Sequence, residues 1–117
     1  MRPTLVICCI GSAVIHLALV PEHLREMPSL GVGFAMSALV LVVAAAATAA
    51  KLPGAELATT WLLIGLVAAY AIVLPFEHEA VTEIAFTTKA IELLGVAAGL
   101  SLLRGNAFPA ALPPSRR

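Results

Sequence analysis

Charged side chains are scarce in this sequence, and their scarcity narrows the possible functions. Seven basic and seven acidic residues occur among 117, so 12% of the chain is charged and the net charge is zero. Soluble domains contain about 25% charged residues. Because no long basic run is present, a nucleic acid is not expected as a partner.

Motifs of common enzymes are also missing. The sequence contains no glycine-rich phosphate loop, no Cys-x-x-Cys pair, no nucleophile elbow and no His-x-x-His spacing. Cys8 and Cys9 are adjacent, and neighbouring cysteines rarely bridge each other, so we expect both to pack as small apolar side chains. Palmitoylation and metal capture are the alternatives for this pair. A non-enzymatic role is therefore expected more than an enzymatic one.

Apolar residues, in contrast, are abundant. They make up 61% of the chain, and the mean hydropathy is +1.01. A soluble domain of this size buries only about 60–68% of its surface, so it could not hide this many apolar side chains from water. They fall into four runs, residues 4–20, 30–50, 57–74 and 84–103. Helices of about 17–25 residues cross a bilayer, so the expected partner is lipid.

The predicted fold is all-α, a four-helix transmembrane bundle with up-down-up-down connections. Isolated strands would leave backbone groups unsatisfied in lipid, and short connections make neighbouring helices antiparallel. We expect residues 1–104 to form one domain and the proline-rich residues 105–117 to form a disordered cytoplasmic tail. A polar loop is predicted at residues 22–29. The first run exceeds a signal-peptide core of about 7–15 residues, so we interpret it as a retained span.

Small residues at helical spacing predict close contacts between helices. Three such pairs occur in the apolar runs: Gly95 and Gly99, Gly65 and Ala69, and Ala46 and Ala50. Such stripes could pack the bundle internally, or they could join two copies of the chain into a homo-oligomer.

The basic residues predict an orientation. One loop residue, Arg25, falls on one side of the predicted spans, and the other side carries Arg2, Lys51, Arg104, Arg116 and Arg117. Basic residues favour the cytoplasmic side of a membrane. We therefore expect a multi-pass protein of the cell inner (plasma) membrane, with both termini in the cytoplasm.

Lys89 and Glu92 are the first candidate functional residues because both lie within an apolar run. At about 1.5 Å per residue, they lie roughly 22 Å and 18 Å from the inner end of that run. A charge at the bilayer centre costs about 2.5–3.5 kcal/mol, so a functional role competes with an ion pair that only neutralises itself. His16 and Tyr70 fall at a similar level, and antiparallel packing could bring all four into one polar cluster. For His16, a hydrogen bond to a backbone carbonyl is the structural alternative.

Two Glu-His stretches form the second candidate site. Each follows a proline at the point where the chain leaves an apolar run. Together they carry Glu22, His23, Glu26, Glu77, His78, Glu79 and Glu83. Imidazole and carboxylate groups suit a divalent metal ion such as zinc, copper or non-haem iron. These residues could form an outward-facing metal site, or they could be solvated loops with incidental histidines.

Short motifs in the first and last runs support a resemblance. The chain reads HLAL at residues 16–19, PEH at 21–23 and TKAIEL at 88–93. In these motifs it resembles small four-span bacterial membrane proteins with an HLxLxPEH-like start, which implies the four-helix topology and brings no established activity. The length is also similar to that of small multidrug-resistance transporters, which use a membrane-embedded Glu in the first helix. His16 fills that class of position here, which argues against drug export.

The sequence therefore predicts a small membrane accessory or binding module with an outward-facing His/Glu site for a metal ion or a proton. The alternative is an oligomeric transporter of an ion or small solute that uses the Lys89/Glu92 pair. With four spans per copy, a transporter would have to oligomerise to build a pathway.

Reporter fusions test the predicted orientation. We expect residues 22–29 and 75–83 to report an external location and residues 51–56 a cytoplasmic one, because the basic residues gather at one side. A cytoplasmic signal from the 75–83 region would overturn both the orientation and the outward-facing site.

Overall fold

The computed structural model describes residues 1–77 and 82–107, and for residues 74–77 it describes the backbone alone. Four α-helices occupy these ranges: α1 (Arg2–Glu26), α2 (Pro28–Ala49), α3 (Ala55–Glu77) and α4 (Glu83–Ala107). No strand occurs in the part of the chain described. The predicted all-α four-helix fold is therefore confirmed, and all four helices are long and apolar enough to cross a membrane.

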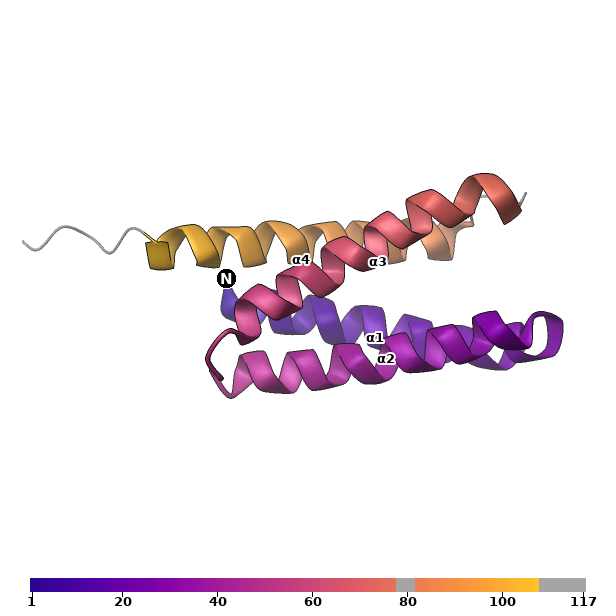
Figure 1. The fold of residues 1–117 in the computed structure, drawn as a ribbon, viewed down its shortest axis with the longest axis horizontal. Helices are drawn as coiled ribbons and strands as arrows, with labels where there is room; N and C mark the ends of the chain where they lie inside the picture. The colour runs from indigo at the N-terminus through magenta and orange to yellow at the C-terminus, as the bar shows by residue number, and fades with distance from the viewer. Residues whose placement is uncertain (78–81, 108–117) are drawn as a thin grey trace, which may run out of the picture.

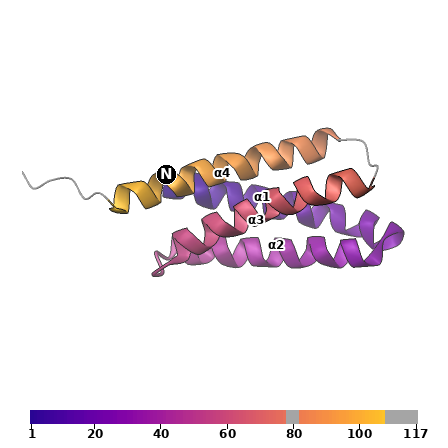
Figure 2. The ribbon, with the colours of Figure 1, turned by 45° about the horizontal axis from the view of Figure 1, so that its top comes forward.

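Helix α1 packs against both α2 and α4, and α4 also packs against α3 (Figures 1 and 2). Helices that follow each other in the chain run in opposite directions in both views (Figures 1 and 2). The most extensive packing joins α1 to α2, and α4 contacts both α1 and α3. The least extensive of the main contacts is between α2 and α3, which cross at an angle near the turn that connects them (Figure 1).

The helix ends correct the predicted boundaries. A loop was expected at residues 22–29, but α1 continues through Pro21 to Glu26, and α2 begins at Pro28. A proline inside a helix removes one hydrogen bond, yet the residues after it are mostly good helix formers. The Met27 N–H then closes the turn on the His23 carbonyl at 2.8 Å, and proline is favoured at the start of the next helix. The predicted loop is therefore wrong.

The last two helices also exceed their predicted ends. Backbone helix in α3 reaches Glu77 rather than ending at residue 74, and α4 reaches Ala107, three residues into the predicted tail. The rest of that tail, residues 108–117, lies outside the described residues.

The turn between α2 and α3 has a left-handed backbone at two positions. Lys51 has φ 58° and Gly54 has φ 76°. The Leu52 N–H donates to the Ala47 carbonyl at 3.1 Å, which satisfies one of the last carbonyls of α2. Glycine adopts a left-handed φ at no steric cost, whereas a lysine there is unusual.

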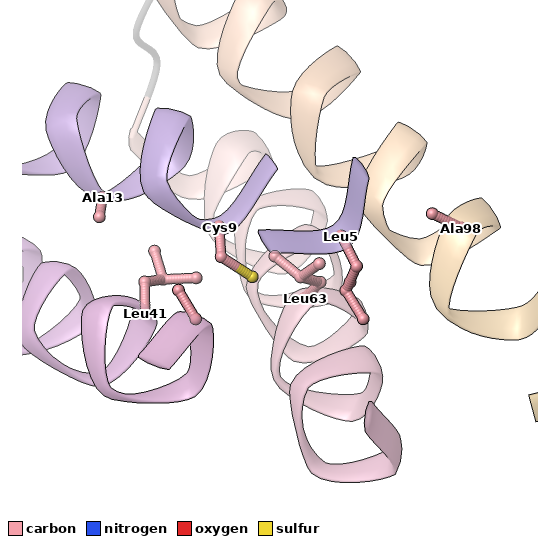
Figure 3. Packing of buried hydrophobic residues seen from close by; sticks show 7 residues of the cluster. Leu5, Cys9, Ala13, Leu41, Leu63 and Ala98 are labelled. Atoms are coloured by element: carbon pink, nitrogen blue, oxygen red, sulfur yellow. The ribbon is translucent and has the colours of Figure 1, made fainter. Parts of the chain in front are cut away.

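The apolar core where the four helices meet combines leucines with small side chains (Figure 3). The core residues are Leu5, Cys9, Ala13, Leu41, Ala45, Leu63 and Ala98. Cys8 is buried as well, so both cysteines pack as small apolar groups, as expected. Larger apolar side chains such as Ile7, Ile72 and Phe86 lie on the outside, each at least 65% exposed.

Polar side chains, in contrast, are buried. They are Ser12, His16, Thr48, Thr59, Thr60, Thr88 and Glu92. Polar side chains in the interior, together with many large apolar side chains on the outside, are unusual for a soluble protein, in which polar and charged residues are mostly exposed. The outer surface therefore suits an apolar solvent, and the interior holds the polar chemistry.

Gly95 and Gly99 pack the bundle internally, one of the two roles predicted for them. A Cβ added to Gly95 would lie 2.6 Å from Leu63 Cδ1 and 3.0 Å from Cys8 Cβ. A Cβ added to Gly99 would lie 3.0 Å from Thr60 Cβ. At Gly65 a Cβ would meet no heavy atom within 4 Å, so that glycine lies on the surface.

A pair of glycine substitutions tests this packing. Gly99→Ala should lower the melting temperature, because the new methyl overlaps the buried and stiff Thr60 at a cost of about 1–3 kcal/mol. Gly65→Ala should leave it unchanged or raise it, because alanine favours helix by about 1 kcal/mol over glycine. Equal stability of the two variants in detergent would contradict the described packing of α3 on α4.

Candidate functional site

The Glu92 carboxylate of α4 is the most deeply buried charge-bearing group described, with none of its side chain exposed. Its Oε2 accepts a hydrogen bond from Lys89 Nζ at 2.5 Å, within the same helix. Its Oε1 accepts one from Ser12 Oγ of α1 at 2.8 Å. A buried carboxylate is tolerated only when its oxygens are paired in this way. Both oxygens of Glu92 therefore have a partner, and one partner belongs to another helix.

His16 extends this network along α1. It lies one helical turn after Ser12, and its Nδ1 is 2.8 Å from the Ser12 carbonyl oxygen and 3.3 Å from Ser12 Oγ. A carbonyl oxygen only accepts hydrogen bonds, so Nδ1 must carry the hydrogen. In the neutral ring, Nε2 is then the nitrogen with a lone pair. His16, Ser12, Glu92 and Lys89 form one continuous chain of polar contacts, which we call the buried polar chain.

Helix α3 completes the surroundings of Lys89. Its ammonium lies 5.0 Å from the centre of the Tyr70 ring, a distance at which a cation is attracted to the aromatic face. Lys89 Nζ is also 3.5 Å from the Leu66 carbonyl oxygen, at the limit of a hydrogen bond. The Lys89 side chain is 17% exposed, whereas that of Glu92 is fully buried. The buried polar chain therefore reaches the edge of the bundle at Lys89.

The four residues expected to form a polar cluster do lie in one region. Lys89 and Glu92 contact each other, Tyr70 contacts Lys89, and His16 reaches Glu92 only through a serine. The carbonyl contact expected as the structural alternative for His16 is present as well.

Ser12 is the functional candidate that the sequence analysis missed. Its position one turn before His16 was a usable signal, because residues four apart lie on the same helix face. At about 1.5 Å per residue it also lies roughly 15 Å from Arg2, close to the level of Glu92.

The predicted metal-binding rim is not assembled by the described residues. Glu22 and Glu26 are exposed, and Glu83 is exposed at the start of α4. His23 Nδ1 is 2.9 Å from the Leu19 carbonyl. Within residues 1–77 and 82–107, no three His, Cys, Asp or Glu side chains gather as metal ligands.

Part of that rim lies beyond what the structure describes. The Glu77 side chain and the whole of His78 and Glu79 fall outside the described part of the chain. A metal site at the rim therefore stays a prediction.

Phe34 of α2 lies between the two histidines of α1. Its ring centre is 5.4 Å from that of His16 and 4.7 Å from that of His23, which meets it edge-on. His23 is partly exposed and His16 is buried. One aromatic ring of α2 thus contacts both histidines of α1.

A second polar group joins three helices at the opposite end. Arg2 of α1 pairs with Glu56 of α3, with Nε 2.7 Å from Oε1. Asn106 of α4 donates to the other Glu56 oxygen at 3.1 Å. Helices α2 and α3 are linked by Thr48 and Thr59, whose hydroxyl oxygens are 2.9 Å apart. No pattern in the sequence indicated these contacts.

Substitutions in the buried polar chain test whether Lys89 and Glu92 neutralise each other. Glu92→Leu alone strands the Lys89 ammonium and should cost about 3–5 kcal/mol, whereas Lys89→Leu/Glu92→Leu should be near neutral. Glu83→Leu removes an exposed carboxylate from the same helix and serves as the control. The measurement is the free energy of unfolding in detergent. A harmless Glu92→Leu variant would show that the two side chains are not partners.

No protein-family model, curated protein or solved structure matches this chain. The observations from which a function can be argued are therefore the buried polar chain and the apolar outer surface. The buried polar chain contains the groups that could bind a ligand or a proton, and the apolar outer surface suits an apolar solvent.

Proposed function

We propose that this chain is a small integral membrane protein whose buried polar chain binds a proton at His16. Its membrane is the cell inner membrane, and both of its termini lie in the cytoplasm. Four helices of sufficient length and apolar surface support the membrane placement. The basic residues at one side of the spans support the orientation.

One observation carries the assignment of His16. Its Nδ1–H faces the Ser12 carbonyl, and the Ser12 hydroxyl donates to Glu92. A proton therefore enters at Nε2, and the imidazolium that forms keeps its contact with Ser12. The Glu92 carboxylate then lies two hydrogen bonds away as the counter-charge. Attraction between opposite charges is strong where the surroundings exclude water.

The same geometry allows the proton to move on. The Ser12 hydroxyl can accept a proton from Nδ1 of the imidazolium while it gives its own to Glu92 Oε1. The products are a neutral imidazole that keeps the proton on Nε2 and a neutral carboxylic acid, so charge and protons balance. Nδ1 then lacks the hydrogen that it donated to the Ser12 carbonyl, so the ring must turn away from that oxygen. The contact of 3.3 Å between Nδ1 and Ser12 Oγ must shorten for this step. Lys89 opposes it, because a neutral Glu92 would no longer form an ion pair with the Lys89 ammonium.

A proton fits this site better than a metal ion does. Structural and catalytic metal sites use three or four protein ligands. Around His16 the described residues supply one imidazole nitrogen with a lone pair, and Glu92 already accepts from two partners. We therefore assign the proton to the interior, while a metal at the rim stays a separate prediction.

Transport is the second candidate function. It is favoured by the partial exposure of Lys89, through which the buried polar chain meets the outer surface of the bundle. A second copy of the chain at this edge could complete a pathway. Native mass spectrometry separates the two functions, because a strict monomer is compatible with proton binding and disfavours transport.

Nitrogen NMR of ¹⁵N-labelled histidine tests the proton site, with His16→Ala used to assign the signal. We expect the protonated fraction of His16 to rise as the pH falls. At a given pH it should be lower in Glu92→Gln, which removes the counter-charge and leaves the Lys89 ammonium. Lys89→Met/Glu92→Gln removes both charges and should lower the protonated fraction of His16 less than Glu92→Gln alone does. Glu83→Gln is the matched control and should change nothing.

Two results would contradict the proposal. One is a His16 signal that stays neutral over the whole range in which the protein is folded. The other is an equal protonated fraction in the wild type and in Glu92→Gln, since the carboxylate would then have no influence on the imidazole.

A further inference from the structure

A groove at the basic end of the bundle has no role in the buried polar chain. It lies between the start of α1 and the end of α2, and these two segments occupy the same end of the molecule (Figure 1). Its volume is about 390 Å³, within the range of about 300–1,000 Å³ found for ligand pockets. Its lining residues are Arg2, Pro3, Val6, Ile7, Ala49 and Lys51. Two cations and an otherwise apolar wall therefore border one open groove.

From this arrangement we infer that the groove binds an anionic phospholipid, with the phosphate between Arg2 and Lys51 and an acyl chain along Val6 and Ile7. The inference goes beyond the proposed proton site and rests on the proposed function for the membrane placement and for the cytoplasmic location of this end. Basic pockets between transmembrane helices on the cytoplasmic side are a known way to hold anionic headgroups. The groove offers both parts that such a lipid needs, a positive mouth and an apolar wall.

The two cations are available to an anion. Glu56 engages Nε and Nη2 of Arg2, and the remaining nitrogen, Nη1, makes no hydrogen bond with the described residues. The Lys51 side chain is exposed, and within residues 1–77 and 82–107 no group bonds to its ammonium. Arg104 adds a further positive charge at the same end. Positive charge is therefore in excess here, despite Glu56.

Lys51 lies in the turn that follows α2 and has an unusual backbone. Its φ of 58° lies in the left-handed region, which a side chain other than glycine or asparagine rarely occupies. A lysine at the end of α2 also compensates the negative end of the helix dipole. The position of this lysine at the end of α2 places a positive charge at the groove.

The apolar wall selects a lipid over a soluble anion. Ile7 is 68% exposed, and Ala49 is exposed beside it, so the groove opens sideways onto the apolar surface of the bundle. A free phosphate would gain nothing from that wall. A phospholipid would cover it with its acyl chain while its headgroup stays at the level of Arg2 and Lys51.

Native mass spectrometry tests the lipid site on the full chain in detergent. The probe is an equal mixture of phosphatidylglycerol and phosphatidylcholine with the same acyl chains. We expect preferential retention of phosphatidylglycerol, and we expect Lys51→Asn to weaken it about fivefold, because one basic residue contributes about that factor near an anionic lipid. Asparagine tolerates the left-handed backbone, so the turn should be kept. Arg25→Gln, at the opposite end, is the matched control and should retain the preference.

Two further arms identify the occupant. Ala49→Leu narrows the apolar part of the groove without changing charge, and it should reduce retention of phosphatidylglycerol. Excess inorganic phosphate should not displace the lipid. Equal retention of the two lipids, equal effects of Lys51→Asn and Arg25→Gln, or displacement by phosphate would overturn the inference. Glu92→Gln should leave the lipid preference intact, so failure of the lipid site and failure of the proton site are distinguishable.

Discussion

Burial of the Glu92 carboxylate is the constraint on which the rest of the bundle depends. An ionised carboxylate away from water is expensive unless it is paired and hydrogen-bonded. Lys89 supplies the opposite charge from the same helix, but the second oxygen needs Ser12, which belongs to α1. The demand of one carboxylate therefore fixes the rotation and the register of α1 against α4.

Glycine makes that register possible. Gly95 lies three residues after Glu92, and an added Cβ there would be 3.0 Å from Cys8 Cβ. The absence of a side chain lets α1 approach α4 closely at Cys8. Because Ser12 follows Cys8 by one turn and the two helices run in opposite directions (Figure 2), the serine hydroxyl reaches the carboxylate. The close packing at Gly95 and the hydrogen bond from Ser12 to Glu92 therefore depend on the same placement of α1 against α4.

Polar contacts hold the helices together at two levels. At one end Glu56 joins α3 to Arg2 of α1 and Asn106 of α4. Towards the other end the buried polar chain joins α1 to α4, and Lys89 of α4 contacts α3. Helix α2 is outside both groups and is held by apolar packing, by Phe34 and by the contact of Thr48 with Thr59. Where lipid surrounds a bundle, such contacts carry more of the specificity, because apolar surface alone does not distinguish a neighbour from lipid.

Much of the fold could be predicted from the sequence because long apolar runs leave few alternatives to helices. Helix boundaries were harder to predict. The continuation of α1 through Pro21 depends on a balance between the one hydrogen bond that proline removes and the helix propensity of the residues that follow. Lys89 and Glu92 were found because charge in an apolar run is conspicuous. Ser12 was missed because a serine in an apolar helix is ordinary until the rotation of that helix is known. The pairing of Arg2 with Glu56 links residues 54 apart, and no local pattern encodes it.

A double-mutant cycle between Ser12→Ala and Glu92→Leu tests the central interaction most directly. The free energy of unfolding would be measured in one detergent for the wild type, both single variants and the double variant. Residues in contact couple by about 0.5–3 kcal/mol, and we predict a coupling in that range. Additivity within about 0.3–0.5 kcal/mol would show that Ser12 and Glu92 act independently, and it would contradict the account of how α1 is set against α4.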